Sequence, residues 1–279
     1  MGDGRLWQVS RPGKVMHRMT VILRPAGKMG SGASELAARN LTVYFEGLSA
    51  LEKIDLTVKR DEILGLIGPN GAGKTTFVNV LTGFQSPHDG GVHLGSEDIT
   101  HWPPHRIRRA GVARTFQAGR LFRDLSVIDN VEASAVSLGL TRRQARVHCM
   151  EILAWIGLGD KAEKIAGTLP YADERRVGIA RALTMKPAFI LLDEPAAGMS
   201  DVECDHLMET IAQIPGRFGA GVLLIEHNMR VVMGICARIH VLDGGRTIAQ
   251  GTPREVQSNP GVITAYLGTK RKRRGEVMI

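Results

Sequence analysis

The chain has 279 residues, of which 43% are hydrophobic and 23% are charged, so a packed core is feasible and wholesale disorder is excluded. Its longest apolar runs span seven or eight residues, as at 152–159, whereas a transmembrane helix needs about 20, so none is expected. The formal net charge of +8 belongs to the two ends, because 1–40 carry +5, 270–279 carry +4 and 41–269 carry −1. We therefore expect no nucleic-acid partner for the body.

The ends of the chain also differ from the rest in composition. Residues 1–37 lack sustained periodicity and include a Gly/Ser cluster at 30–33, which predicts a flexible basic extension. Residues 269–279 form a basic tail, which is either solvated or in contact with anionic lipid headgroups. Residues 38–268 are predicted to form the folded body. Its three cysteines lie far apart without CxxC spacing, which is typical of unpaired thiols in a reducing compartment.

The body alternates predicted strands and helices. Strands are expected where apolar and polar residues alternate, at 54–58, and where apolar residues run continuously, at 63–67, 189–192 and 222–225. Helices are expected at about 74–81, 141–156 and 177–183, and a Gly-Gly turn at 244–245 is expected to join a hairpin. This order predicts an α/β sheet whose ligands bind at the carboxyl ends of its strands.

A phosphate-binding loop is predicted at 68–75, which fits GxxxxGK[ST] directly after a strand and before a helix. Glycines let successive backbone N–H groups line a phosphate-sized hollow, and the helix points its positive end there. Lys74 would reach the β- and γ-phosphates, Thr75 a Mg²⁺ ion and Thr76 the α-phosphate. The alternative is a glycine-rich turn with an unrelated lysine. The predicted ATP-binding loop residues are Gly68, Pro69, Asn70, Gly71, Ala72, Gly73, Lys74, Thr75 and Thr76.

An acidic pair follows the apolar strand at 189–192. Successive strand residues point in opposite directions, so Asp193 and Glu194 can serve different tasks. We predict that Asp193 holds the metal and that Glu194 orients or deprotonates the attacking water. An apolar run followed by two acids is a weak signal alone, but here it follows a matching phosphate loop.

Further features follow in a consistent order. Phe45 precedes Lys74 by 29 residues, Gln117 ends a TFQ triplet after a predicted strand, and His227 ends an IEH triplet after another. The segments LPYADERR at 169–176 and AGMS at 197–200 lie between them. This set resembles the ATP-binding subunits of ABC transporters over roughly 38–268. The stretches ITHWPPHRIRRAGVARTFQ, LFRDLSVIDNV, DEPAAGM, LIEHNM and GVITAYLG are similar to the branched-chain amino acid uptake type, LivG.

The resemblance implies a P-loop NTPase fold of the ABC ATPase type. Its sheet would be mixed, with an antiparallel β part and an inserted helical subdomain at about 118–180. Phe45 would stack on adenine, Gln117 would reach magnesium and the attacking water, and His227 would contact the γ-phosphate. The magnesium ligands would be Thr75, Gln117 and Asp193. A second ATPase subunit would receive the signature segment of this chain, Leu169, Pro170, Tyr171, Ala172 and Asp173.

The signature segment departs from the usual LSGGQ. If the backbone at Ala172 needs a positive φ, its Cβ costs roughly 1–2 kcal/mol. Pro170 offers neither a serine hydroxyl nor an N–H, and Asp173 is expected to cap the next helix. Ser200 stands where the family more often has Asp or Asn. The residues with which the chain would bind its own nucleotide are complete, whereas the signature segment that it would donate to a partner is altered. This combination favours a heterodimer with a paralogous ATPase and two unequal sites.

Three functions compete on the sequence alone. The leading one is an ATPase on the cytoplasmic face of the inner or plasma membrane, where it drives import of a branched-chain or other small amino acid. Its partners would be two membrane permease subunits and, indirectly, a solute-binding protein, and urea or an amide is an alternative solute. A ribosome- or nucleic-acid-associated ATPase is disfavoured because the chain has one phosphate loop and no sustained heptads. A regulator that binds ATP but hydrolyses it weakly stays open because of Ala172.

Overall fold

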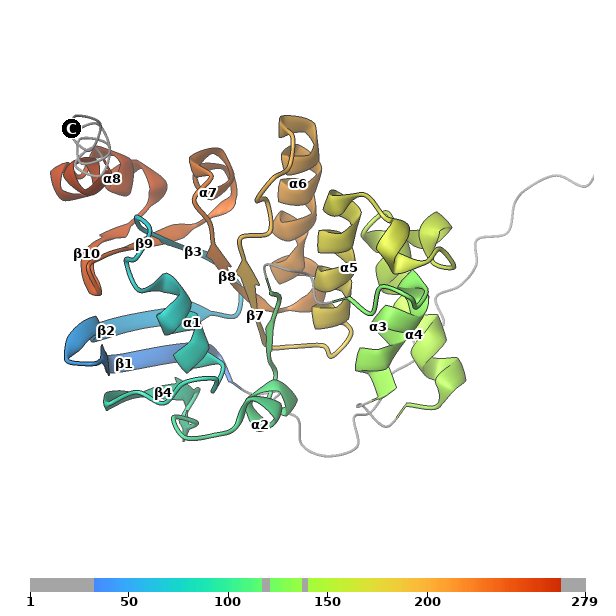
Figure 1. The fold of residues 1–279 in the computed structure, drawn as a ribbon, viewed down its shortest axis with the longest axis horizontal. Helices are drawn as coiled ribbons and strands as arrows, with labels where there is room; N and C mark the ends of the chain where they lie inside the picture. Colours follow the sequence, from blue (N-terminus) through green and yellow to red (C-terminus); the bar gives the residue numbers. More distant parts are fainter. Residues whose placement is uncertain (1–32, 117–120, 137–139, 267–279) are drawn as a thin grey trace, which may run out of the picture.

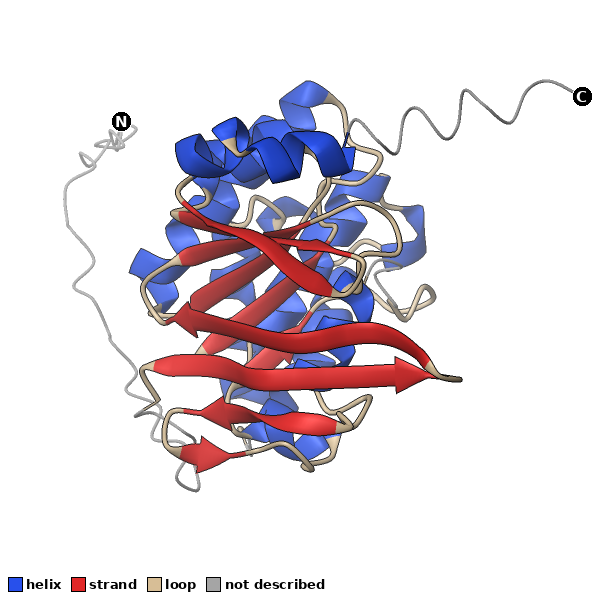
Figure 2. Cartoon of the chain, turned by 90° about the vertical axis from the view of Figure 1, so that its left-hand side faces the viewer, coloured by secondary structure: helices blue, strands red, loops and turns tan. Residues whose placement is uncertain are grey.

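Two sheets organise the protein in the computed structural model, which describes residues 33–116, 121–136 and 140–266. The four-stranded antiparallel sheet has the order β2-β1-β4-β5. The six-stranded sheet has the order β10-β9-β3-β8-β7-β6 (Figures 1 and 2). The strands are β1 (Glu35–Phe45), β2 (Leu48–Lys59), β3 (Ile63–Ile67), β4 (Asp89–Leu94), β5 (Glu97–Asp98), β6 (Val112–Arg114), β7 (Phe189–Asp193), β8 (Gly221–Ile225), β9 (Arg238–Asp243) and β10 (Arg246–Gly251).

The centre of the six-stranded sheet is parallel. β3 pairs in parallel with β8 and β9, and β7 pairs in parallel with β6 and β8. β3, β7 and β8 are buried at every position, as expected for continuous apolar strands covered on both faces. β10 returns antiparallel beside β9, which confirms the hairpin predicted at Gly244-Gly245. The predicted mixed sheet with an antiparallel part is therefore confirmed.

Two hydrophobic cores lie on the two faces of this sheet. Ile63 and Ile67 of β3 belong to one core, and Leu64 and Leu66 to the other, because neighbouring strand residues point to opposite faces. The second core lies between the two sheets and also receives the apolar face of α1. The helices are α1 (Lys74–Leu81), α2 (Pro104–Arg109), α3 (Val127–Ala135), α4 (Arg142–Trp155), α5 (Tyr171–Leu183), α6 (Asp201–Phe218), α7 (Met229–Ile235) and α8 (Pro253–Ser258).

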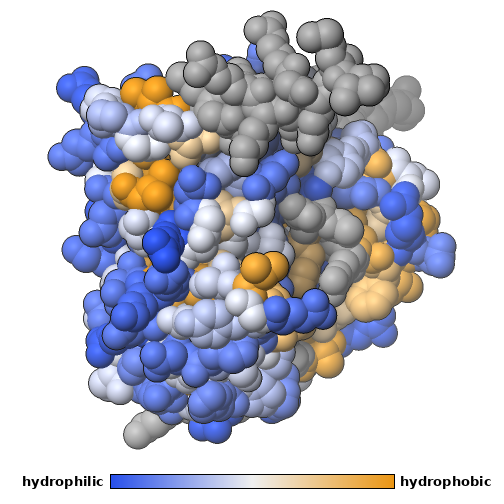
Figure 3. Space-filling model, turned by 60° about the vertical axis from the view of Figure 1, so that its left-hand side comes forward, coloured by the Kyte–Doolittle hydropathy of each residue, from blue (hydrophilic) through white to orange (hydrophobic). Residues whose placement is uncertain are grey.

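The helices α3 and α4 lie beside α5 at one side of the molecule, away from the antiparallel sheet (Figure 1). They fall within the helical subdomain predicted at about 118–180, although α5 continues to Leu183. The face over the antiparallel sheet is mostly hydrophilic, with small separate hydrophobic patches (Figure 3). Among the described residues, no helix has the length and hydropathy needed to cross a bilayer.

Two predicted boundaries are wrong. β1 begins at Glu35, so the body starts before the predicted residue 38, because Glu35 pairs with Lys59 at the end of β2. α5 begins at Tyr171 instead of 177, because Pro170 is its N-cap and the first helical turn runs through the signature segment. The predicted extension, apart from its last residues, and the basic tail lie outside the described residues.

Candidate active site

The phosphate loop connects β3 to α1, as predicted. Gly68, Gly71 and Gly73 have positive φ values of 152°, 82° and 100°. A β-carbon at Gly68 would lie 2.1 Å from Leu242 O, and one at Gly73 would lie 2.6 Å from Ala50 O. Only glycine fits at these two positions, where the loop packs tightly against the ends of β9 and β2. The loop therefore has the tight backbone that turns N–H groups toward one point.

Lys74, the first residue of α1, is half-buried beside this loop. Its Nζ donates hydrogen bonds to Gly68 O at 2.7 Å and Pro69 O at 3.1 Å. Burial lowers the pKa of Lys74, and the nearby charges of Glu194 and Asp193 partly oppose that shift. The lysine thus lies within electrostatic reach of both acids, although they follow it by more than 100 residues in sequence.

The strand order explains this convergence. β8 separates β3 from β7, and β6 flanks β7, so the carboxyl ends of these parallel strands meet at one edge. The loop at Gly68 follows β3, Glu194 follows β7 and His227 follows β8. Gln117, which follows β6 in sequence, lies outside the described residues. The edge of the sheet is the place where α/β folds bind ligands.

Asp193 is buried and tied to its neighbours. Its Oδ2 lies 2.8 Å from Arg114 Nη2, and its backbone N–H donates to Thr115 Oγ1 at 3.2 Å. Arg114 also donates to Asn79 Oδ1 of α1 at 2.7 Å. These bonds hold the end of β7 against β6 and α1. Sequence reasoning missed Arg114, whose signal was its place three residues before the predicted Gln117.

Glu194 adopts a left-handed backbone with φ of 47°, and its N–H donates to Ile225 O at 2.9 Å. Its Oε1 lies 3.8 Å from Nδ1 of His227, so the structure brings the predicted base and the predicted γ-phosphate contact together. A left-handed non-glycine residue is strained, and such strain is concentrated at functional sites. The turn after β7 therefore aims the Glu194 carboxylate at the same edge as His227.

Glu226 is a second residue that sequence reasoning missed. Its side chain is fully buried and accepts hydrogen bonds from the N–H groups of Ala196 at 2.7 Å, His227 at 3.1 Å and Asn228 at 3.3 Å. These three bonds satisfy the oxygens of a carboxylate that is shielded from water. Glu226 thereby joins the turn after Glu194 to the end of β8. Its sequence signal was an acid between a buried strand and His227.

The other predicted nucleotide contacts differ in exposure. Phe45, at the end of β1, is 48% exposed, so its ring is free to stack on a base. Thr75 is exposed, and Thr76 is partly buried in the first turn of α1. The oxygens of Thr75 and Asp193 form a hard-ligand set that suits Mg²⁺, which is usually bound by few protein groups together with phosphates and waters.

The signature segment is helical from Tyr171 onward, which corrects two expectations. Ala172 has no positive φ and is buried in the first turn of α5, so the condition under which its Cβ would strain the backbone is not met. Asp173 does not cap α5 either. Its buried carboxylate instead pairs with Lys161 Nζ at 2.6 Å and Arg176 Nη1 at 3.5 Å. Leu169 and Pro170 precede the helix, and Tyr171 is 48% exposed.

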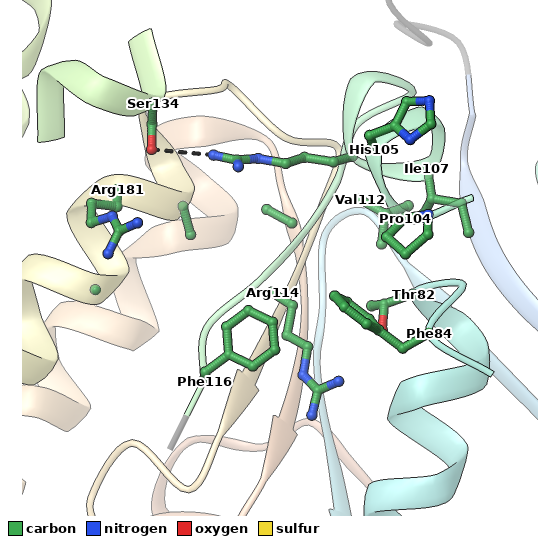
Figure 4. Close-up of a pocket in the computed structure, with 14 residues that line it drawn as sticks. Thr82, Phe84, Pro104, His105, Ile107, Val112, Arg114, Phe116, Ser134 and Arg181 are labelled. Carbon is green, nitrogen blue, oxygen red and sulfur yellow. Dashed lines mark hydrogen bonds between the residues drawn. The ribbon is translucent and has the colours of Figure 1, made fainter. Parts of the chain in front are cut away.

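A groove of about 320 Å³ lies beside the site, between α2, the end of α1, β6 and α5. The rings of Phe84 and Phe116 meet edge to face there, 5.8 Å apart (Figure 4). Arg108 donates to Ser134 Oγ of α3 at 3.1 Å across the groove (Figure 4). Phe116 is the last described residue before Gln117, so the groove adjoins the predicted catalytic segment.

Comparison with known proteins agrees with this site. Residues 51–197 match the ABC transporter family, and 246–271 match the branched-chain amino acid ATP-binding cassette transporter family. LivG of Salmonella typhimurium, a high-affinity branched-chain amino acid transport ATP-binding protein, is 42% identical over 84% of this chain and 97% of its own length. BraF of Pseudomonas aeruginosa, which has the same description, is 39% identical over the same shares.

A solved structure shows the same architecture. An ATP-binding cassette of an ABC transporter in its ADP conformation superimposes with a TM-score of 0.77 at 28% identity, covering 84% of this chain and 98% of that one. Both the motifs and the strand order of the site are therefore those of a known class of ATPase. The chain belongs to the ATP-binding subunits of ABC transporters.

Proposed function

We propose that this chain hydrolyses ATP to drive import of a branched-chain or other small amino acid through separate membrane subunits. The observation that carries the proposal is the convergence of Lys74, Asp193 and Glu194 at one edge of the sheet, with His227 3.8 Å from Glu194. LivG and BraF, the relatives of known transport role, support the amino acid class of solute.

The residues of the site divide the work of phosphoryl transfer. Backbone N–H groups of the phosphate loop and the positive end of α1 hold the phosphates, and Lys74 leaves its own loop carbonyls to pair with them. Thr75 and Asp193, with Gln117, would hold Mg²⁺, which neutralises charge on the phosphates when bound. Glu194 orients the attacking water and His227 contacts the γ-phosphate. Phe45 stacks on the adenine.

A second ATPase subunit completes each site in this proposal. Pro170 and Tyr171 are the exposed residues of the signature segment, and we propose that they face a nucleotide held by the partner. Because Pro170 and Ala172 replace the usual serine and glycine, we propose a paralogous heterodimer with two unequal sites. Equal ATP turnover at both sites of the purified complex would contradict this asymmetry.

The groove beside Phe116 is our proposed docking site for a segment of a membrane subunit. Its aromatic rings, Phe84 and Phe116, offer apolar surface to such a segment. Phe116 directly precedes Gln117, so a segment bound in the groove could affect ATP hydrolysis through that residue. The chain would then be a peripheral protein on the cytoplasmic face of the membrane and would meet the solute-binding protein only indirectly.

Reconstitution tests the function. The chain, its paralogue and the two permeases would be placed in proteoliposomes, and ATP hydrolysis would be measured with binding protein loaded with leucine, urea or acetamide. We expect leucine to stimulate hydrolysis and to be transported. Stimulation by urea or acetamide alone would change the solute class, and the absence of any ATP hydrolysis would overturn the proposal.

A further inference from the structure

Arg175, on the second turn of α5, is a buried cation without an acidic partner. It is 8% exposed, and no ion pair involves it among the residues that the structure describes. The acids beside it are paired elsewhere, Asp173 with Lys161 and Arg176, and Glu174 with Arg123. Burying a charge without a counter-charge is costly unless hydrogen bonds replace the lost water. The hydrogen bonds of Arg175 must therefore offset the cost of burying its charge.

Those contacts join two segments of the site. Arg175 Nη1 donates to Phe116 O at 3.2 Å, and Nη2 donates to the Tyr171 hydroxyl. The guanidinium carbon also lies 4.7 Å from the centre of the Tyr171 ring, within range of a cation–π interaction. The Nε–H has no hydrogen-bond partner among the described residues, so the side chain is not arranged to satisfy every donor.

Tyr171 extends the connection to a third segment. A β-carbon built on Gly198 would lie 3.5 Å from Tyr171 Cε1, so the space between this glycine and the ring has room for about one methyl group. Gly198 has a φ of +76°, and two overlapping turns connect it to Glu194, closed by hydrogen bonds from Ala197 N to Glu194 O at 3.3 Å and from Met199 N to Ala196 O at 3.2 Å. Direct contacts thus run from Phe116 through Arg175 to Tyr171, and the Tyr171 ring is the near neighbour of Gly198.

We propose that Arg175 is a positioning residue that couples the segment entering Gln117 to the turn after Glu194, through Tyr171. This inference rests on the proposed function, because the two segments matter together only if ATP is hydrolysed between them. Phe116 lines the groove, so a membrane segment that docks there displaces the carbonyl that Arg175 holds. The displacement reaches the Glu194 turn through the Tyr171 ring.

Four variants of the full chain, assembled with its paralogue and permeases, test the coupling. They are Arg175→Gln, Arg175→Lys, Tyr171→Phe and the double variant Arg175→Gln/Tyr171→Phe. Arg175→Gln is expected to lower the solute-stimulated kcat roughly 2- to 30-fold, the range typical of coupling residues. The KM for ATP should change by less than about twofold, because no nucleotide contact is removed. Arg175→Lys, which keeps the charge and one donor nitrogen, should recover part of the kcat.

The double variant gives the sharpest result. If Arg175 and Tyr171 act through one connection, the kcat of the double variant should equal that of Arg175→Gln alone. A loss of kcat equal to the product of the two single-variant losses would overturn the proposal. Tyr171→Phe removes one hydroxyl, so it remains informative if Arg175→Gln fails to fold, and an unchanged kcat in Tyr171→Phe would then overturn the proposal.

Arg217→Gln is the matched control, since the Arg217 guanidinium also lies over a ring, 5.5 Å from the centre of Trp155, at an exposed position of α6. It should leave the stimulated kcat unchanged. An equal loss of stimulated kcat in Arg217→Gln would show that Arg175 has a merely structural role. The same holds if the loss of kcat in Arg175→Gln is fully explained by a lower melting temperature of the variant. A wild-type complex without ATP hydrolysis would instead overturn the proposed function itself.

Discussion

Arg114 and Asp193 form an ion pair at 2.8 Å in which both side chains are more than nine-tenths buried. The two residues are 79 positions apart in sequence and lie on neighbouring strands, β6 and β7. The same guanidinium binds Asn79 on α1. The carboxylate that we assign to magnesium is therefore oriented from the strand that leads to Gln117.

Removing this guanidinium is expected to destabilise the fold. Arg114→Leu removes the ion-pair partner of the buried Asp193 carboxylate, which typically costs about 3–5 kcal/mol. Urea denaturation followed by circular dichroism measures the change. Arg246→Leu is the matched control, because Arg246 pairs with Glu52 at 2.6 Å while the two side chains are 67% and 36% exposed. Its loss should stay near 1 kcal/mol or below, and similar losses in both variants would contradict the special role of the Arg114 pair.

The phosphate-loop lysine should be essential for nucleotide affinity. Lys74→Ala removes the mobile charge beside the loop, so ATP binding to the purified chain, measured by titration calorimetry, should fall below detection. The variant should stay folded, since Lys74 Nζ binds only two carbonyls of its own loop. Lys59→Ala, on the exposed end of β2, serves as the control and should bind ATP normally. Undiminished affinity in Lys74→Ala would remove this lysine from the site.

Substitution of Glu194 should nearly abolish ATP hydrolysis while leaving ATP binding intact. Glu194→Gln keeps the size of the side chain but loses the charge that orients and activates water. It should retain ATP while kcat falls by roughly 100-fold or more, as is typical for loss of a general base. Quenched-flow product analysis and nucleotide filter binding measure the two effects. Glu209→Gln, an exposed acid on α6, is the control, and wild-type turnover in Glu194→Gln would exclude it as the base.

Acid should weaken the fold through His240. Burial lowers the pKa of this histidine to about 4, and its Nε2 lies 2.8 Å from Thr247 Oγ1. The unfolded chain, with an ordinary histidine pKa near 6.5, binds the proton more readily than the folded one. The neutral form therefore stabilises the fold fully above about pH 6.5, and the contribution is lost as pH falls toward 4, by up to roughly 3 kcal/mol.

Denaturation between pH 7 and 4 measures that loss. His240→Gln carries no titrating group, so its free energy of unfolding should fall less steeply with acid than that of the wild type. The same substitution at exposed His105 should leave the slope unchanged. Parallel slopes for the wild type and His240→Gln would show that other groups govern acid unfolding.

Local patterns in the sequence were enough for the phosphate loop and its helix. Only glycine tolerates the backbone at Gly68 and Gly73, and the helix at 74–81 begins directly after them, as the structure shows. The fully buried strands were also recognisable, because a strand covered on both faces is apolar at every position. The assignments of Phe45, Gln117 and His227 stay predictions, and Gln117 lies outside the described residues.

The sequence by itself thus determined the class of ATPase. Each motif is a short run of adjacent residues, and the order and spacing of the motifs are visible without the fold. Tertiary structure alone decided which partner each buried charge has. Arg114 pairs with Asp193, Asp173 pairs with Lys161, and Glu226 accepts a hydrogen bond from the backbone N–H of Ala196. It also placed the start of α5 at Tyr171, where the signature segment becomes helical. These features depend on strand order and helix packing, which bring distant side chains together and which short-range patterns do not encode.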